Sequence, residues 1–203
     1  MGGGCREAFG FAALVLIEES DKLSQRAFEI SSMTKNILLT GRPGCGKTTL
    51  VRRVVKEVAQ PAGGFYTEEI RKHRERVGFK IVTLEGKERV FAHLNLKTQQ
   101  RLGKYGLDLS PLETIGIEAV RKAVRARELT VIDEIGPMEI RSAIFRDAVN
   151  KALNSRVPLL GTITARLFPF TNAIKKRRDV TLIEVRRDNR EELVSELSDH
   201  FTA

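Results

Sequence analysis

The stretch Gly41-Arg42-Pro43-Gly44-Cys45-Gly46-Lys47-Thr48 decides the fold of this 203-residue chain. It matches the pattern G-x-x-x-x-G-K-[ST], in which glycines let backbone N–H groups turn inward and approach phosphate oxygens. In this pattern Lys47 reaches the β- and γ-phosphates of a nucleotide, and the hydroxyl of Thr48 ligates Mg²⁺. The stretch therefore predicts a phosphate-binding loop.

The residues on either side of the loop support this interpretation. Lys35–Thr40 is a short apolar run that indicates a buried strand, and Lys47–Ala59 carries apolar residues at helical spacing. The loop then precedes a helix N-terminus, where the helix dipole favours an anion. We expect the nucleotide to contact the loop and the first helical residues, namely Gly41, Arg42, Pro43, Gly44, Cys45, Gly46, Lys47, Thr48 and Thr49.

Composition limits the remaining classes of protein. The chain has enough residues for one well-buried domain, and its 41% hydrophobic content is that of a globular protein. A formal charge of +9 suits phosphate-bearing ligands, nucleic acid or an acidic partner, although a solvated basic surface is the commoner cause. The 2 cysteines form neither a disulfide framework nor a zinc spacing, which predicts a cytoplasmic protein. His73, His93 and His200 are scattered, so we expect no histidine metal site.

The N-terminal segment has a different character from the rest. Ala8–Ile17 is apolar but too short to cross a bilayer, and no signal-peptide cleavage site follows it. Met33 stands just before the first predicted strand. We therefore expect residues 33–203 to form the domain and residues 1–32 to be an upstream extension. The alternative is an amphipathic helix that docks on the domain.

The rest of the chain alternates between predicted strands and helices. An antiparallel meander is expected from the strands Phe65–Ile70, Gly78–Leu84 and Glu88–Leu94. Beyond it, Ser110-Pro111-Leu112-Glu113 has the pattern of a capping box, and Asp188 with Glu191 has the same spacing. The expected elements are a helix to about Glu128, a strand Leu129–Ile132, a helix Ser142–Leu153, strands Val157–Thr164 and Asp179–Val185, and a last helix to about Ser198. This alternation predicts an α/β fold with a mostly parallel sheet, helices on both faces and an inserted β-meander.

A phosphate loop needs an acid at the tip of a neighbouring strand, and Asp133 follows such a strand. Asp133 would orient Mg²⁺, with Thr48 as the second metal ligand. Glu134 comes next, where a carboxylate can polarise a water for attack on the γ-phosphate. The simpler alternative is that Glu134 only caps the turn at Gly136-Pro137. The segment expected to line the nucleotide site is Val131, Ile132, Asp133, Glu134, Ile135, Gly136, Pro137 and Met138.

Phosphoryl transfer also needs a cation against the charge that develops on the γ-phosphate. Lys47 is the first such residue. Further candidates are Arg42, Arg166 and the cluster Lys175-Lys176-Arg177-Arg178, although each member of that cluster also fits a solvated helix end. Thr164 could contact the γ-phosphate, but threonine is common in strands for packing reasons alone.

These motifs together resemble a known family, the small nucleoside-triphosphatases first described from thermophiles, which has a human cancer-related member. The resemblance covers Met33 to the C-terminus. Its residues are Asn36–Leu50, Gly64–Glu69, Gly78–Val82 and, most specifically, the segment Leu129–Glu139 with Asp133-Glu134-Ile135-Gly136-Pro137-Met138-Glu139. The resemblance implies a P-loop NTPase fold that is a variant of RecA, Mg²⁺ dependence, and slow hydrolysis of several nucleoside triphosphates.

Two other functions remain open. A nucleotide or nucleoside kinase would use the same phosphate loop, with Arg166–Arg178 as a lid, but a glutamate directly after the magnesium aspartate favours water as the acceptor. A nucleic-acid-binding ATPase is allowed by the charge but not favoured, because aromatic content is 6% with no tryptophan. We expect a monomer.

Two further expectations follow from the same residues. Because Asp133 and Glu134 are adjacent, Val157–Thr164 is expected to lie between the phosphate-loop strand and the acid-bearing strand, parallel to both. The chain lacks an Asn-Lys-x-Asp element for reading guanine, and its nearest stretch is Asn95-Leu96-Lys97-Thr98. Broad base specificity is therefore expected.

Overall fold

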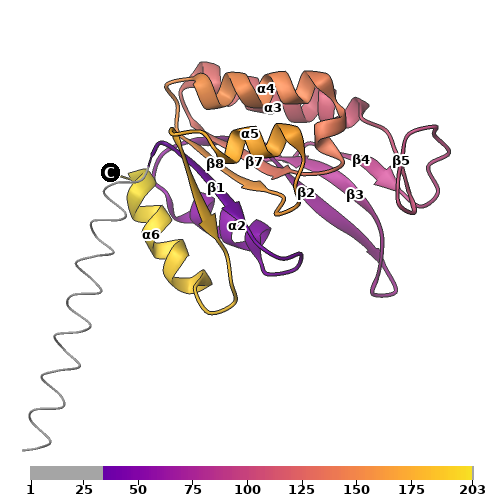
Figure 1. Ribbon diagram of the computed structural model, residues 1–203, viewed down its shortest axis with the longest axis horizontal. Helices are drawn as coiled ribbons and strands as arrows, with labels where there is room; N and C mark the ends of the chain where they lie inside the picture. The colour runs from indigo at the N-terminus through magenta and orange to yellow at the C-terminus, as the bar shows by residue number, and fades with distance from the viewer. Residues whose placement is uncertain (1–33, 203) are drawn as a thin grey trace, which may run out of the picture. The chain divides into compact units, whose positions relative to one another are not determined.

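The computed structural model describes residues 34–202 and shows one α/β domain (Figure 1). The predicted extension at residues 1–32, and Met33, lie outside the described residues. A single nine-stranded sheet runs through the domain in the order β5-β6-β4-β3-β2-β7-β8-β1-β9. Within residues 34–202, no helix is long and apolar enough to cross a membrane.

Five neighbouring strands form the parallel half of the sheet, and the three central ones are almost entirely buried. Burial on both faces explains why the three central strands read as apolar runs in the sequence. The five strands are β2 (Ala62–Lys72), β7 (Leu129–Ile135), β8 (Leu159–Ile163), β1 (Asn36–Thr40) and β9 (Val180–Glu184).

Strand β8 lies between β1 and β7 and is parallel to both. Its first residue, Leu159, is paired with Asn36 on one side and with Thr130 on the other. The predicted intervening strand is thereby confirmed. The acid-bearing end of β7 is separated from the phosphate loop by the width of one strand.

The predicted meander continues the same sheet as an antiparallel half. Strand β2 belongs to both halves, because it is parallel to β7 and antiparallel to β3. Two of the strands, β5 and β6, were not predicted, because two or three residues show no period. The antiparallel strands are β3 (Glu75–Thr83), β4 (Glu88–His93), β6 (Tyr105–Leu107) and β5 (Arg101–Leu102).

Helices cover both faces of the sheet (Figure 1). Helix α2 (Lys47–Glu57) follows the phosphate loop and packs beside α6 (Arg190–Thr202). Helices α3 (Ile117–Ala126), α4 (Ala143–Asn154) and α5 (Pro169–Lys175) lie on the opposite face (Figure 1). The short helix α5 ends within the basic cluster, which was interpreted from the sequence as a solvated helix end and, only for a kinase, as part of a lid.

The predicted capping box at Ser110 is wrong. The chain enters α3 through one wide π-helical turn, Leu112–Gly116, and the Ser110 carbonyl accepts a bond from the Thr114 hydroxyl. Glu113 accepts a hydrogen bond of 2.6 Å from the Ser142 hydroxyl, which itself caps α4 by accepting from the Phe145 N–H. A distant partner therefore took the glutamate that the local pattern had assigned to Ser110.

Candidate active site

The phosphate loop connects β1 to α2 and is held closely by the chain that follows β9. Gly46 precedes α2 with a left-handed φ of 101°, and a Cβ there would lie 2.7 Å from a guanidinium nitrogen of Arg190. A Cβ on Gly41 would lie 2.6 Å from the Val185 carbonyl oxygen. Gly41 is therefore required by contact with the backbone of a second segment, whereas Gly46 is required by its left-handed φ, because the Arg190 side chain could move aside.

Lys47 is the first residue of α2 and folds back over the loop. Its ammonium donates to the carbonyls of Gly41 at 3.2 Å and of Arg42 at 3.4 Å. These two weak bonds hold the ammonium against the backbone carbonyls at the start of the phosphate loop. Lys47 is thus placed where the terminal phosphates of a bound nucleotide would lie.

A cavity of about 520 Å³, called the reactive cavity here, opens beside this lysine. It brings together the four residues predicted to do the chemistry: Lys47, Thr48, Asp133 and Glu134. Its walls come from the phosphate loop, the start of α2, the end of β7 and the β2–β3 hairpin. The complete lining is Pro43, Gly44, Gly46, Lys47, Thr48, Thr49, Arg52, Thr67, Glu68, Glu69, Arg71, Arg76, Phe79, Asp133 and Glu134.

Asp133 is almost fully buried at the end of β7. Its Oδ1 accepts a hydrogen bond from Thr162 of β8. Burial raises the pKa of the Asp133 carboxyl, whereas hydrogen bonds from Thr162 and Thr48 and the charge of Lys47 act in the opposite direction. Its Oδ2 is buried and has no hydrogen-bond partner among the described residues.

An unpartnered, buried carboxylate oxygen is costly unless a cation or a donor reaches it. The Thr48 hydroxyl lies close enough to the Asp133 carboxyl to lower its pKa, so the two oxygen ligands are neighbours. Hard divalent cations such as Mg²⁺ prefer oxygen ligands of this kind, with only one or two from the protein. The donor set therefore fits Mg²⁺. In residues 34–202 no cluster of three His, Cys, Asp or Glu side chains offers a different metal site.

Glu134 also lines the reactive cavity, and its carboxylate lies beside Gly136 of the following turn. Burial raises the pKa of the Glu134 carboxyl, the negative charge of Asp133 raises it further, and Lys47 lowers it. A carboxylate in this setting is a stronger base than an exposed glutamate. This is the property needed to take a proton from water.

A second buried glutamate, Glu139, has its carboxylate on the same side of Gly136 as that of Glu134. A Cβ on Gly136 would lie 2.9 Å from Oε2 of Glu139 and 3.0 Å from Oε1 of Glu134. Burial and the charge of Glu134 raise the pKa of Glu139 to about 8. The sequence pattern assigned Glu139 no role of its own, because nothing in it shows that this carboxyl turns back toward Glu134.

The other residues expected to line the nucleotide site do not reach the reactive cavity. Val131, Ile132 and Ile135 are fully buried in the core, so they position the two acids. Gly136 leaves room for the carboxylates of Glu134 and Glu139, and Met138 packs against the hydrophobic core. Pro137 is half-buried in the same turn.

The candidate cations Arg42, Arg166, Lys175 and Arg177 lie in different places, and none of them lines the reactive cavity. Arg42 lines a second cavity beside the loop. The Lys175 ammonium lies 3.4 Å from the Arg166 carbonyl, and neither residue lines the reactive cavity. Arg177 is tied to Asp179 by bonds of 2.8 and 2.6 Å and to Asn154 by one of 2.7 Å, at the opposite end of β9 from the loop. Arg177 is therefore a structural residue.

Thr164, which was considered as a contact of the γ-phosphate, lies in a turn, and an unexpected cation lines the reactive cavity. The Thr164 hydroxyl accepts a bond from the Arg166 N–H within the local turn, so this threonine acts as a turn residue. A cation that was not predicted, Arg52 of α2, does line the reactive cavity. Its guanidinium lies 3.9 Å from the ring centre of Tyr66 and 2.7 Å from a carboxylate oxygen of Glu68.

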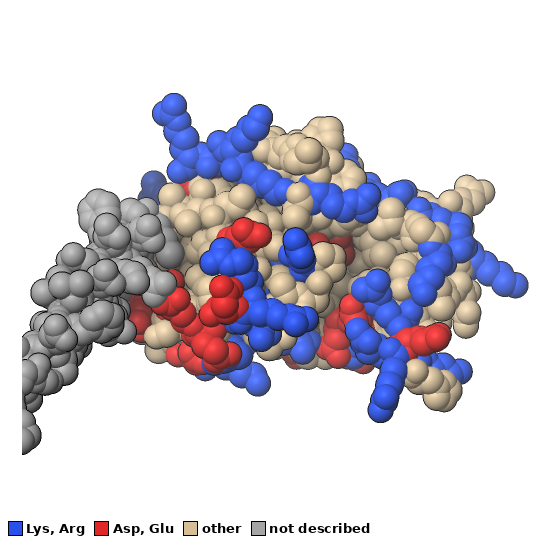
Figure 2. Space-filling view, turned by 60° about the horizontal axis from the view of Figure 1, so that its bottom comes forward, with Lys and Arg blue, Asp and Glu red and all other residues tan. Residues whose placement is uncertain are grey.

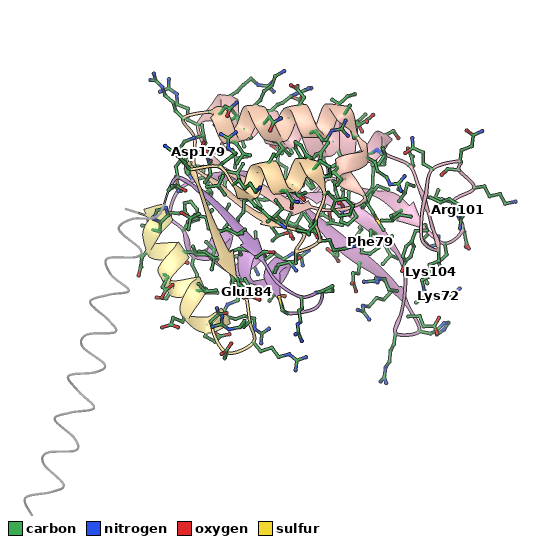
Figure 3. All side chains as sticks on the ribbon, viewed as in Figure 1. Lys72, Phe79, Arg101, Lys104, Asp179 and Glu184 are labelled. Atoms are coloured by element: carbon green, nitrogen blue, oxygen red, sulfur yellow. The ribbon has the colours of Figure 1, made fainter. Side chains whose placement is uncertain are left out.

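Residues Glu184–Arg190 form a second wall that the sequence patterns did not reveal. The cavity beside them has a volume of about 410 Å³ and is lined by Arg42, Pro43, Gly44, Cys45, Glu184, Val185, Arg186 and Arg187. Figure 3 marks Glu184 at the carboxyl end of β9. No sequence signal could have found this wall, because only the pairing of β1 with β9 brings it to the loop.

Comparisons with known proteins agree with this geometry. The sequence model of a family described as NTPase matches residues 36–198. The nucleoside-triphosphatase THEP1 of Thermotoga maritima is 44% identical over 161 residues, which cover 79% of this chain and 92% of that protein. THEP1 of Methanocaldococcus jannaschii is 34% identical over 170 residues, covering 82% of this chain and 97% of that protein.

Two solved structures share the fold. The crystal structure of THEP1 from Aquifex aeolicus superposes with a TM-score of 0.74 at 35% identity, covering 80% of this chain and 96% of that one. The solution structure of a human cancer-related nucleoside triphosphatase gives 0.70 at 33% identity, covering 81% and 95%. A phosphate loop, an acid pair one strand away and these relatives lead to one conclusion: the chain is an enzyme of the nucleoside-triphosphatase family with a P-loop α/β fold.

Proposed function

We propose that this enzyme hydrolyses ATP, GTP and other nucleoside triphosphates to the diphosphate and phosphate, slowly, with Mg²⁺ and with little preference for the base. The observation that carries the proposal is the placement of Glu134 in the same cavity as Lys47, Thr48 and Asp133. A carboxylate that faces the terminal phosphate has water as its natural partner.

The residues divide the reaction between them. Loop N–H groups and the Lys47 ammonium bind the phosphate oxygens and stabilise the charge that develops on them. Glu134 holds a water in line with the γ-phosphorus and accepts its proton. The water oxygen bonds to phosphorus, the bond from phosphorus to the β–γ bridging oxygen breaks, and the nucleoside diphosphate leaves.

Thr48 and Asp133 would hold the Mg²⁺ ion. When bound, the ion supplies positive charge that neutralises the β- and γ-phosphate oxygens. The unpartnered Oδ2 of Asp133 is the observation that supports this assignment.

Broad specificity is supported by where the assigned contacts go. Lys47, Thr48, Asp133 and the loop all address phosphates or the metal, which every nucleoside triphosphate carries. We expect ATP and GTP to be used with similar kcat/KM, and pyrimidine triphosphates to lie within about a hundredfold. A preference of more than about a thousandfold for one purine would require a base-reading pocket.

The test is phosphate release from each of the common triphosphates with Mg²⁺, using the full chain. Glu134→Gln is the matched variant, because it keeps the shape of the side chain and removes the base. It should still bind nucleotide but lose about two to four orders of magnitude in turnover. A near-normal rate in Glu134→Gln would show that another group activates the water.

A kinase remains the second candidate, and one observation favours it. The reactive cavity continues past Glu134 to the β2–β3 wall formed by Arg71, Arg76 and Phe79, which leaves room for an acceptor molecule. Arg71 and Arg76 both pair with the same carboxylate, Glu69, at 2.5 and 2.8 Å, so one of their two positive charges is left for an acidic acceptor. Transfer of ³²P from labelled ATP to an added nucleoside, in preference to water, would establish the kinase.

A nucleic-acid partner has less support. On the face of the molecule drawn in Figure 2, basic side chains are spread widely and are interrupted by acidic ones, so they do not form one continuous basic surface. Figure 3 marks Lys72, Arg101 and Lys104 toward the ends of the hairpins of the antiparallel half.

We also propose that the protein is cytoplasmic and that it is a monomer. Light scattering of the purified chain tests its oligomeric state.

A further inference from the structure

The second cavity, lined by Arg42–Cys45 and Glu184–Arg187, shares two lining residues with the reactive cavity. Pro43 and Gly44 at the tip of the phosphate loop contribute to both. A ligand that lies along the loop can therefore extend from one cavity into the other. The volume of about 410 Å³ is within the usual range of about 300–1,000 Å³ for small-molecule sites.

The chemistry fixes which end of the substrate enters which cavity. In an in-line displacement, the attacking water and the leaving diphosphate lie on opposite sides of the γ-phosphorus. Glu134, which holds the water in the proposed function, lines the reactive cavity. The diphosphate and its nucleoside must then point away from Glu134. The second cavity is lined by neither Glu134 nor Asp133.

The outer wall of this cavity is preformed. The Val185 N–H donates to the Thr40 carbonyl at 2.8 Å, which extends the pairing of β9 with β1 to the base of the loop. The Asn189 side chain bridges the turn, since it accepts from the Arg186 N–H at 2.8 Å and donates to the Glu184 carbonyl at 3.0 Å. Binding therefore needs little ordering of this segment, which favours affinity.

The residues at the mouth of the cavity suit a flat, polar heterocycle. Arg186 and Arg187 are both exposed there, and Arg186 makes only a long contact of 3.4 Å with the exposed Asp188. A guanidinium plane stacks on any nucleobase, because every base has a π face. Resting on the proposed function, we propose that the nucleoside of the bound triphosphate lies in the second cavity, with Arg186 and Arg187 stacked against its base.

This placement agrees with broad specificity. Stacking discriminates weakly among bases, whereas hydrogen bonds to a base edge would discriminate strongly. The cavity thus supplies affinity for the nucleoside without selecting a purine. Inorganic tripolyphosphate has the phosphates and no nucleoside, so it would occupy the reactive cavity alone. Comparing it with ATP therefore measures what the second cavity contributes to binding.

The experiment compares KM for ATP and for tripolyphosphate with Mg²⁺. The double variant Arg186→Lys/Arg187→Lys keeps both charges and removes both planar groups, and Arg156→Ala, in the turn before β8, is the control. The double variant should raise KM for ATP by about three- to thirtyfold, the range of a lost stacking contact, and leave KM for tripolyphosphate within about twofold. Equal changes for the two substrates, or no change for either, would overturn the placement.

Photolabelling with 8-azido-ATP locates the base without relying on turnover. Label is expected on the peptides that contain residues 184–187 or 42–45. Label on Arg71–Phe79, or on any peptide outside the second cavity, overturns the placement. A chain that is labelled at residues 184–187 but hydrolyses neither substrate would refute the proposed function and leave the nucleoside site standing.

Discussion

The parallel and antiparallel halves of the sheet share strand β2 but bury their residues differently. Every residue of β8 is buried, whereas the first three residues of β4 are exposed. All four residues assigned to the chemistry are held by the parallel half, at the carboxyl ends of its strands. The antiparallel half adds a wall that contains Phe79 and the arginines Arg71 and Arg76, both paired with Glu69. In the proposed mechanism, catalysis therefore depends on residues that follow strands packed in the core.

The largest expected effect is a loss of hydrolysis from a substitution in the parallel half. Lys47→Ala removes the fixed cation from the terminal phosphates, so hydrolysis should fall by at least about a thousandfold. Lys72→Ala removes the same charge from the antiparallel half and should leave the rate within about twofold. Phosphate-release assays on the two variants measure the contrast. A tenth or more of the normal rate in Lys47→Ala would contradict the assigned role.

The strand shared by both halves offers the next test. Gly64 of β2 has a φ of 117°, and a Cβ there would lie 2.1 Å from the Val131 carbonyl oxygen of β7. Gly64→Ala should cost about 3 kcal/mol or more, lowering Tm by about 10 °C. Gly86→Ala, in the turn between β3 and β4, has a similar φ of 88° but meets nothing within 4 Å. It should cost about 1 kcal/mol, from backbone strain alone. Equal Tm values would show that β2 and β7 separate easily.

The acid cluster of the parallel half should make stability depend on pH. Native Glu139 has a pKa of about 8, raised from 4.5, so it keeps a proton that the unfolded chain loses. This contribution is full below pH 4.5 and is lost as the pH rises toward 8. In Glu139→Gln the side chain is always neutral. Between pH 5 and 9 the wild-type Tm should fall by about 10 °C relative to the variant, measured without nucleotide or metal. Parallel curves would show that Glu139 is ionised throughout.

The smallest effect is expected on the antiparallel wall. Arg76 donates to Glu69 at 2.8 Å and to the Tyr105 hydroxyl at 3.2 Å, and its side chain is 44% exposed. Arg76→Ala should therefore cost less than about 1 kcal/mol of stability and change kcat/KM for ATP by less than about threefold. A loss of tenfold or more would place this arginine against a substrate and favour the kinase.

Sequence patterns found the parts of the site whose geometry is local. The glycines and Lys47 sit within one loop, and Asp133 ends an apolar strand, so both could be predicted from the order of the residues alone. The order of β1, β8 and β7 also followed, because an acid pair at that position implied an intervening strand. Arg177 was weighed only as one member of a basic cluster, since its partners Asp179 and Asn154 are set by the turn before β9.

The parts that were missed depend on contacts between distant segments. Arg190 packs against Gly46, and Val185 against Gly41, only after β9 has paired with β1. Glu113 was assigned to a local cap but found Ser142. Strands β5 and β6 are too short for a period of two to appear. A tertiary partner overrides a local pattern whenever it offers the better hydrogen bond or the better packing.

The pairing of β1 also decides when the phosphate-binding site can form during synthesis. The two neighbours of β1 are β8 and β9, so Asn36 can pair only after Leu159 and Val180 have been synthesised. The hairpin of β2 and β3, by contrast, closes within a few residues of its own turn. Contacts of low sequence separation form quickly and distant ones slowly. On the ribosome, the antiparallel half can therefore assemble first, while the phosphate loop lacks its walls until almost the entire chain has emerged.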